Sequence, residues 1–193
     1  MKMKKILSLT ILMMSVVFAG AQEENTSKPQ AIQVVVKRDR SKDEENAKAK
    51  RAYIGKQFSE LEMADVNGET HKLSEYAGNG HWLFVDFWAS WCGPCRNEMP
   101  YVVSAYEKYH LKGVDFVSIS LDNDKDKWVK AIDELQMPWT DLSDLKGWKS
   151  EASTVYHINK IPDNLLIDPQ GTIVERELRE DGLLEKFAEI FGE

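Results

Sequence analysis

The sequence predicts an α/β fold in which helices cover both faces of one central mixed β-sheet. Strand-like and helical segments alternate from Ile54 onward, and this order builds sheets covered by helices. Turn signals at Asn67-Gly68 and over 168–171 predict a β-hairpin near each end of that region. Apolar residues make up 42% of the 193-residue chain, which is enough for one buried core.

The first predicted elements are a hairpin, a buried strand and a helix. Residues 58–64 and 70–73 flank the first turn, which favours two short paired strands. Trp82 to Phe87 is apolar apart from one acid, which is typical of a buried strand. Apolar residues recur at helical spacing over 95–111, so the sequence predicts a helix there.

A second strand–helix–strand series follows this helix. The apolar run over 114–120 predicts a strand. Either Asn123 or Asp124 can cap a helix over 125–136, which has apolar residues along one face. A short strand is expected at 139–142.

The last part of the chain reads as a short helix, a hairpin and a terminal helix. Residues 150–156 predict the short helix, and the strands 164–167 and 172–175 flank the second turn. Apolar residues at helical spacing over 183–191 predict an amphipathic helix that packs on the sheet.

The first 21 residues have the layout of a secretory signal peptide. A basic start is followed by an apolar run over 6–18 and by the small residues Ala19-Gly20-Ala21. The alternative is a membrane anchor, but a run of about 13 residues is short of the ~20 that span a bilayer. We therefore expect cleavage after Ala21 and a periplasmic or otherwise exported protein.

The segment 22–50 is polar and rich in charges. We expect a mostly flexible linker there, with a short strand at Ile32 to Val36, ahead of one domain over 51–193. The formal net charge of −7 argues against a nucleic-acid partner, because such a surface needs clustered positive charge.

Cys92 and Cys95 are the only two cysteines of the chain. They would close a very small ring, so a purely structural disulfide explains them poorly. A zinc site would need two further ligands, and the four histidines show no suitable spacing. Covalent haem attachment would need a histidine where Arg96 stands. A redox-active CxxC pair at a turn from strand to helix fits this context best.

The position of the pair predicts different roles for the two sulfurs. Cys92 would precede the first helical turn, where unpaired N–H groups stabilise a thiolate and lower its pKa below about 8.5. Cys95 would be shielded, so Cys92 attacks a partner disulfide and Cys95 resolves the mixed disulfide. Gly93 would let the turn form without a clash, and Pro94 suits a helix start.

The segment VDFWASWCGPCRNEMP resembles the active-site segment of the thioredoxin superfamily. More narrowly, residues 53–191 resemble the exported TlpA/ResA-like branch of thiol–disulfide oxidoreductases. The resemblance implies a thioredoxin fold with an N-terminal β-hairpin and an inserted helix and strand at about 124–142. It also implies that a redox-active disulfide serves in place of a cofactor or metal.

The resemblance implies a cis-proline at Pro162 that faces the cysteines. The backbone of Ile161 would then pair with a substrate strand. Thioredoxins often have a threonine after this proline, whereas this chain has Asp163. We expect Asp163 to be partly exposed near Cys92, where its charge would raise the thiol pKa and repel acidic partners.

Two further residues, Asp86 and Glu98, match positions of the family. Asp86 matches a buried acid whose pKa burial would raise toward neutrality, so that it can take the proton of Cys95. Glu98 matches an acid that would tune the thiols or contact partners. A solvated strand edge for Asp86 and an exposed helix position for Glu98 are the alternatives. Trp91 is expected to contact partners.

The expected function is the reduction of disulfides in exported proteins, since Gly-Pro between the cysteines resembles the reducing thioredoxins. Candidate substrates are the oxidised CxxCH of apocytochrome c, in cytochrome c maturation, and misoxidised secreted proteins. A membrane thiol carrier would supply the electrons. The alternatives are a peroxiredoxin-like peroxide reductase and a non-enzymatic binding or chaperone module on the same scaffold.

Overall fold

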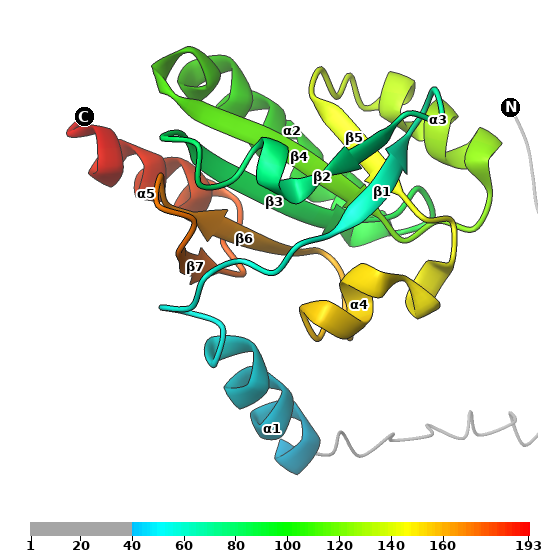
Figure 1. Cartoon of the computed structure of the whole chain (residues 1–193), viewed down its shortest axis with the longest axis horizontal. Helices are drawn as coiled ribbons and strands as arrows, with labels where there is room; N and C mark the ends of the chain where they lie inside the picture. The colour runs from blue at the N-terminus through cyan, green and yellow to red at the C-terminus, as the bar shows by residue number, and fades with distance from the viewer. Residues whose placement is uncertain (1–39) are drawn as a thin grey trace, which may run out of the picture. The chain divides into compact units, whose positions relative to one another are not determined.

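The structure is a computed structural model that describes residues 40–193 (Figure 1). The expected signal peptide and the expected strand at Ile32 to Val36 lie outside these residues. Between residues 40 and 193, no helix is long and apolar enough to cross a membrane.

The centre of the fold is a seven-stranded mixed sheet with the strand order β2-β1-β5-β4-β3-β6-β7. The strands are β1 Glu62–Asp65, β2 Thr70–Lys72, β3 Trp82–Trp88, β4 Val114–Ser120, β5 Thr140–Ser143, β6 Asp163–Ile167 and β7 Ile173–Arg176. β3, β4 and β5 run parallel to one another. β6 pairs antiparallel with β3, and β1 pairs antiparallel with β5, so the mixed sheet is confirmed.

Five α-helices and three short 3-10 turns accompany the sheet in the described part of the chain. The helices are α1 Arg40–Arg51, α2 Gly93–Tyr109, α3 Lys125–Glu134, α4 Glu151–Val155 and α5 Asp181–Phe191. The 3-10 turns are η1 Leu73–Glu75, η2 His110–Lys112 and η3 Gly147–Lys149. α3 and β5 are the expected helix and strand at about 124–142.

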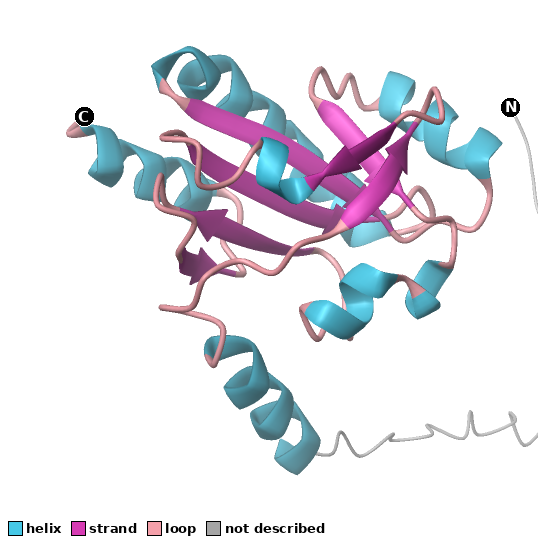
Figure 2. Ribbon diagram, in the orientation of Figure 1, coloured by secondary structure: helices cyan, strands magenta, loops and turns pink. Residues whose placement is uncertain are grey.

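Helices cover both faces of the sheet, as Figure 2 shows. The ring of Phe84 in β3 lies 6.3 Å from that of Phe187 in α5, whereas Phe87 lies 5.8 Å from Tyr156 beside α4. Successive side chains of a strand point to opposite faces, so α5 and α4 cover opposite faces. α2 shares the face of α5, since the rings of Tyr109 and Phe187 lie 5.0 Å apart.

α1 begins inside the segment for which the sequence predicts a mostly flexible linker. Its sequence RSKDEENAKAKR has no apolar stripe, which explains why hydrophobic periodicity does not find it. An ion pair holds the C-terminal end of α1 against the sheet. Lys50 is 2% exposed, and its Nζ lies 2.6 Å from Oδ2 of Asp163 in β6. The helix is therefore anchored by a buried ion pair, which no local sequence pattern predicts.

Candidate active site

The two cysteines lie at the turn from β3 into α2, as expected. Cys92 is the N-cap of α2 and Pro94 stands in its first turn. The two sulfurs form a disulfide with an S–S distance of 2.03 Å and a Cα–Cα distance of 5.3 Å. The backbone N–H of Cys95 donates to Sγ of Cys92 at 3.2 Å. When the disulfide is reduced, this donor and the helix dipole favour a thiolate on Cys92.

Cys92 is more enclosed than the exposed nucleophile that the sequence predicts, whereas Cys95 is shielded as predicted. Cys92 is 5% exposed and Cys95 is 1% exposed, so Cys92 is the more accessible of the two, but only slightly. Gly93 and Pro94 are exposed beside them. The expected steric need for Gly93 is wrong: apart from its chain neighbours and the nearby backbone of α2, no atom lies within 4 Å of an added Cβ. The glycine instead leaves the surface beside Cys92 open.

The peptide bond between Ile161 and Pro162 is cis. This bond directly precedes β6, whose first residue, Asp163, pairs with Phe87 near the end of β3. The register therefore brings the cis-proline to the end of β3 from which the chain enters Cys92. Among the hydrogen bonds between described residues, none uses the backbone of Ile161. The backbone N–H and C=O groups of Ile161 are therefore open to pairing with a partner strand, which is the role that the resemblance implies.

Asp86 is buried within β3, so the solvated edge is wrong. Its exposed fraction is 3%, and burial raises the pKa of its carboxyl to about 7. The nearby guanidinium of Arg179 opposes the rise in pKa, whereas the charges of Glu98 and Asp163 add to it. Asp86 lies on the same face of β3 as Phe84, which is the face that α2 covers. A carboxyl in this position can exchange a proton at neutral pH beneath the cysteine helix.

Glu98 is also buried, with an exposed fraction of 8%, so it is not an exposed helix glutamate. Its carboxylate accepts a hydrogen bond from the backbone N–H of Glu180, which is the N-cap of α5. A carboxylate is favoured at a helix N-terminus. Glu98 therefore joins the cysteine helix to α5 and adds a negative charge near Asp86.

Arg179 is a site residue that the sequence analysis misses. Its guanidinium donates to the carbonyl oxygens of Pro162 and Leu178. It also holds the pKa of Asp86 lower than burial alone would. Arg179 stands in the charged run ERELRED, in which no motif marks one residue, so only the fold shows its contact with the cis-proline.

The expectation for Asp163 is wrong. Its side chain is 0% exposed, and both carboxylate oxygens accept from Arg176, at 3.1 Å and 2.9 Å. Lys50 supplies a second cation, and it also pairs with Glu177 at 3.0 Å. The negative charge next to the cis-proline is therefore compensated by two buried cations. It is not presented to a partner, so it gives no reason to expect repulsion of acidic substrates.

Comparisons with known proteins agree with this geometry. The model of the AhpC/TSA family matches residues 54–176, which include both cysteines and the cis-proline. The chain belongs to the AhpC/TSA family.

Relatives that are similar to this chain are named for redox chemistry. The "Thiol-disulfide oxidoreductase ResA" of Oceanobacillus iheyensis is 37% identical over 120 residues, which cover 62% of this chain and 58% of the relative. A protein of the same name from Bacillus cereus is 31% identical over 127 residues, covering 66% of this chain and 70% of the relative.

Solved structures that are similar to this chain are also thiol-disulfide oxidoreductases. The thioredoxin domain of a thiol-disulfide oxidoreductase from Bacteroides vulgatus is 30% identical, with a TM-score of 0.66, over 71% of this chain and 96% of that one. A thiol-disulfide oxidoreductase from Bacteroides fragilis is 29% identical, with a TM-score of 0.66, over 70% of this chain and 99% of that one. The resemblance to thioredoxin-like thiol–disulfide oxidoreductases is thus confirmed.

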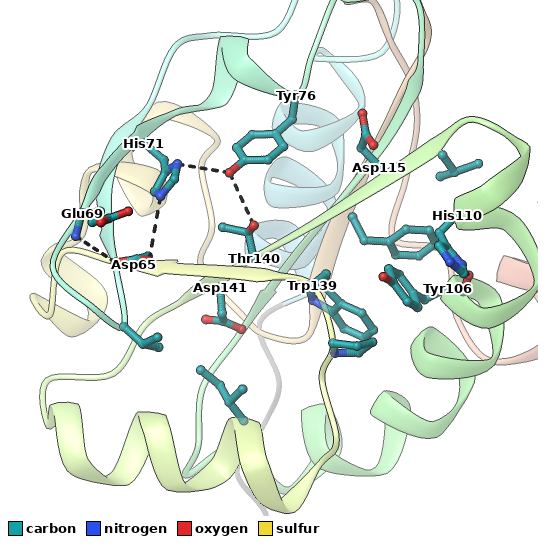
Figure 3. A pocket seen from close by; sticks show the side chains of 15 residues that line it. Asp65, Glu69, His71, Tyr76, Tyr106, His110, Asp115, Trp139, Thr140 and Asp141 are labelled. Carbon is teal, nitrogen blue, oxygen red and sulfur yellow. Dashed lines mark hydrogen bonds and ion pairs between the residues drawn. The ribbon is translucent and has the colours of Figure 1, made fainter.

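A cavity of about 570 Å³ lies apart from the cysteines of this AhpC/TSA chain (Figure 3). Neither cysteine nor Pro162 lines it. Figure 3 shows the Tyr76 hydroxyl between His71 and Thr140, to which it lies at 3.3 Å and 3.4 Å. The cavity is therefore separate from the redox site.

Asp65, Glu69 and His71, at the edge of this cavity, have the donor atoms that a metal ion uses, all within 4.8 Å of one another. The hairpin itself accounts for this grouping. The Asp65 carboxylate accepts from the backbone N–H groups of Asn67 and Glu69 at 2.8 Å, which stabilises the turn.

Proposed function

We propose that this chain is an exported thiol–disulfide reductase that acts through a Cys92/Cys95 dithiol. The observation that carries the proposal is the sulfur of Cys92 at the N-terminus of α2, above a buried acid that titrates near pH 7. The names of the ResA relatives support the reaction class.

The reaction has two exchange steps. The Cys92 thiolate attacks one sulfur of the partner disulfide, which forms a mixed disulfide and releases the other partner sulfur as a thiolate. Cys95 then loses its proton to the ionised Asp86, and its thiolate attacks Sγ of Cys92. This step releases the second partner thiolate and leaves the Cys92–Cys95 disulfide. The partner gains two electrons, and the pair loses two.

The direction and the partners are the finer parts of the proposal. Gly-Pro between the cysteines is the thioredoxin dipeptide, and thioredoxin is reducing, at about −270 mV. The signal-peptide layout of the first 21 residues supports export. In an oxidising compartment the disulfide must be reduced again, so a membrane thiol carrier is the proposed donor. Oxidised CxxCH segments of apocytochrome c and misoxidised secreted proteins are the proposed substrates.

The test is disulfide reduction together with trapping. The mature protein should reduce insulin with dithiothreitol as donor, and Cys92→Ser should abolish the activity. Cys95→Ser should accumulate mixed disulfides, and their identification in the exported fraction names the substrates. Equal activity of the wild type and Cys92→Ser would refute the proposal. Peroxide consumption that exceeds insulin reduction would favour the peroxide-reductase alternative, and binding without turnover would favour the binding module.

A further inference from the structure

Two exposed tryptophans lie together beside the reactive cysteine. Among the described residues, five large apolar side chains are exposed, and they are Ile54, Trp91, Leu111, Val129 and Trp148. Trp91 directly precedes Cys92 and is 52% exposed, and Trp148 in η3 is 49% exposed. Their ring centroids are 6.0 Å apart. Large apolar side chains that gather on a surface indicate a contact site, whereas single ones do not.

Both tryptophans line a groove of about 560 Å³. We call it the tryptophan groove, and define it by Trp91, Leu121, Lys146, Trp148 and Lys149, which line it. Its lining is mixed: the two tryptophans and the buried Leu121 are apolar, whereas Asn123 and the two lysines are polar.

One buried residue, Asp122, fixes both tryptophan-bearing segments. Its carboxylate accepts from the backbone N–H and the hydroxyl of Ser90, at 2.8 Å and 2.6 Å, directly before Trp91. Its backbone carbonyl accepts from the N–H of Gly147 at 3.3 Å, directly before Trp148. Asp122 itself is 1% exposed. The groove is therefore held in shape before a partner arrives, which lowers the entropy cost of binding.

The rim of the tryptophan groove is positively charged. Lys146 and Lys149 line it and are exposed, and no acidic side chain lines it. The Nζ of Lys146 also lies 3.7 Å from Oδ2 of Asp144, whose side chain is largely buried outside the groove lining. This local charge contrasts with the formal net charge of −7 for the whole chain. Opposite charge on a partner would guide its approach and set its orientation.

We infer that the tryptophan groove selects the substrate of the proposed reductase: an extended, disulfide-bearing segment with an apolar side chain and a carboxylate next to its cysteine. The apolar side chain fills the space against the tryptophans, and the carboxylate meets the two lysines. Cys92 follows Trp91 directly, so a segment held there brings its disulfide to the nucleophile. The inference rests on the proposed function and adds the substrate class.

The experiment uses two peptides with the same internal disulfide. Each has a phenylalanine beside one cysteine, followed by glutamate in the first peptide and by lysine in the second. We expect the wild type to have a several-fold higher kcat/KM for the glutamate peptide. Trp148→Ala should lower kcat/KM for that peptide about tenfold, mainly through KM, and Trp148→Phe should recover part of the loss. The double variant Lys146→Glu, Lys149→Glu should reverse the preference.

Two controls distinguish an effect on binding in the groove from an effect on thiol–disulfide exchange. Leu111→Ala removes another exposed apolar side chain, outside the groove, and should change nothing. Bis(2-hydroxyethyl) disulfide is small and uncharged, so the groove variants should reduce it at the wild-type rate. Wild-type kcat/KM for both peptides in Trp148→Ala and in the double lysine variant would overturn the inference.

The proposed function and the inference about the groove can be refuted separately. A wild type that reduces neither bis(2-hydroxyethyl) disulfide nor either peptide contradicts the reductase. Binding then still tests the groove, because a Cys92→Ser, Cys95→Ser variant cannot turn over. Tryptophan fluorescence of that variant should report tighter binding of the glutamate peptide. Equal binding of the two peptides would reject the groove whatever the activity shows.

Discussion

At the scale of single residues, the buried carboxyl of Asp86 makes the stability of the protein depend on pH. Its pKa rises from 3.8 to about 7 because burial penalises the ionised form. Between these two pH values the folded state binds more protons at this group than the unfolded state. Stability from this group is therefore greatest at low pH, falls as the pH rises toward 7, and stays low above it.

Asp86→Asn should therefore stabilise the protein at neutral and alkaline pH. Above pH 7 the gain in the free energy of unfolding has an upper bound of about 4 kcal/mol, because each pKa unit corresponds to about 1.4 kcal/mol. At pH 4 most of the gain should be lost, since the folded-state carboxyl is then neutral and the unfolded-state carboxyl is about half protonated. Urea unfolding of the oxidised proteins at pH 4 and pH 8 measures both values. An equal gain at the two pH values would contradict the raised pKa.

The same substitution should slow the resolution of mixed disulfides, because asparagine cannot accept the proton of Cys95. Single-turnover reduction of insulin should show the mixed disulfide accumulating in Asp86→Asn. The wild-type rate of resolution should rise through pH 7 as the carboxyl ionises, and the variant should lack this rise. Identical pH profiles would show that Asp86 does not handle the proton.

Arg179 should control the pKa of Asp86. Its guanidinium lowers that pKa, so Arg179→Met should raise it above about 7. The rise of the resolution rate should then move to higher pH. Arg96→Met is a matched control on α2, because Arg96 pairs with Glu134 at the surface, at 2.9 Å. The same pH profile in both variants would contradict the assignment.

At the scale of elements, α1 is held to the sheet by charge. Lys50 and Arg176 bring two buried cations to Asp163, which directly follows the cis-proline. Buried charges of this kind are costly when one partner is removed, because the remaining charge stays out of water.

Lys50→Met should therefore destabilise the protein by about 3 kcal/mol. Lys48→Met is a matched control, because Lys48 is an exposed lysine of the same helix. Urea unfolding at pH 7 measures both. Equal stabilities of the Lys50→Met and Lys48→Met variants would show that the ion pair does not anchor the helix.

At the scale of the whole molecule, segments far apart in sequence meet at the redox site. β3 and α2 supply Asp86, the cysteines and Glu98, and the start of β6 supplies the cis-proline. The segment before α5 adds Arg179, and α1 adds Lys50. Residues 39–193 form one compact unit, so this unit should contain everything that the site needs.

Truncation tests this boundary. A chain that starts at Asp39 should unfold in one transition and reduce insulin at the rate of the mature protein. A chain that starts at Ala52 lacks α1 and should lose about as much stability as Lys50→Met loses, roughly 3 kcal/mol. Calorimetry and insulin reduction measure the two effects. An inactive chain from Asp39 would show that earlier residues belong to the site.

From β1 onward, the amino-acid sequence predicts the order of the main strands and helices and the centre of the chemistry. β4 was predicted with its observed bounds, and the CxxC pair was predicted at the strand-to-helix turn where it lies. Asp86 could be predicted as a buried acid because its apolar neighbours stand next to it in the chain. These features are local, and periodicity and turn residues report on local neighbours.

Which charges and rings meet around that centre is known from the folded structure and not from the sequence. Asp163 looked exposed because its cations, Lys50 and Arg176, lie elsewhere in the sequence. Arg179 and Trp148 carry no motif, and they gain their roles from contacts with Pro162 and Trp91. A buried charge or an exposed ring is defined by neighbours in space. When those neighbours come from distant segments, the folded chain alone brings them together.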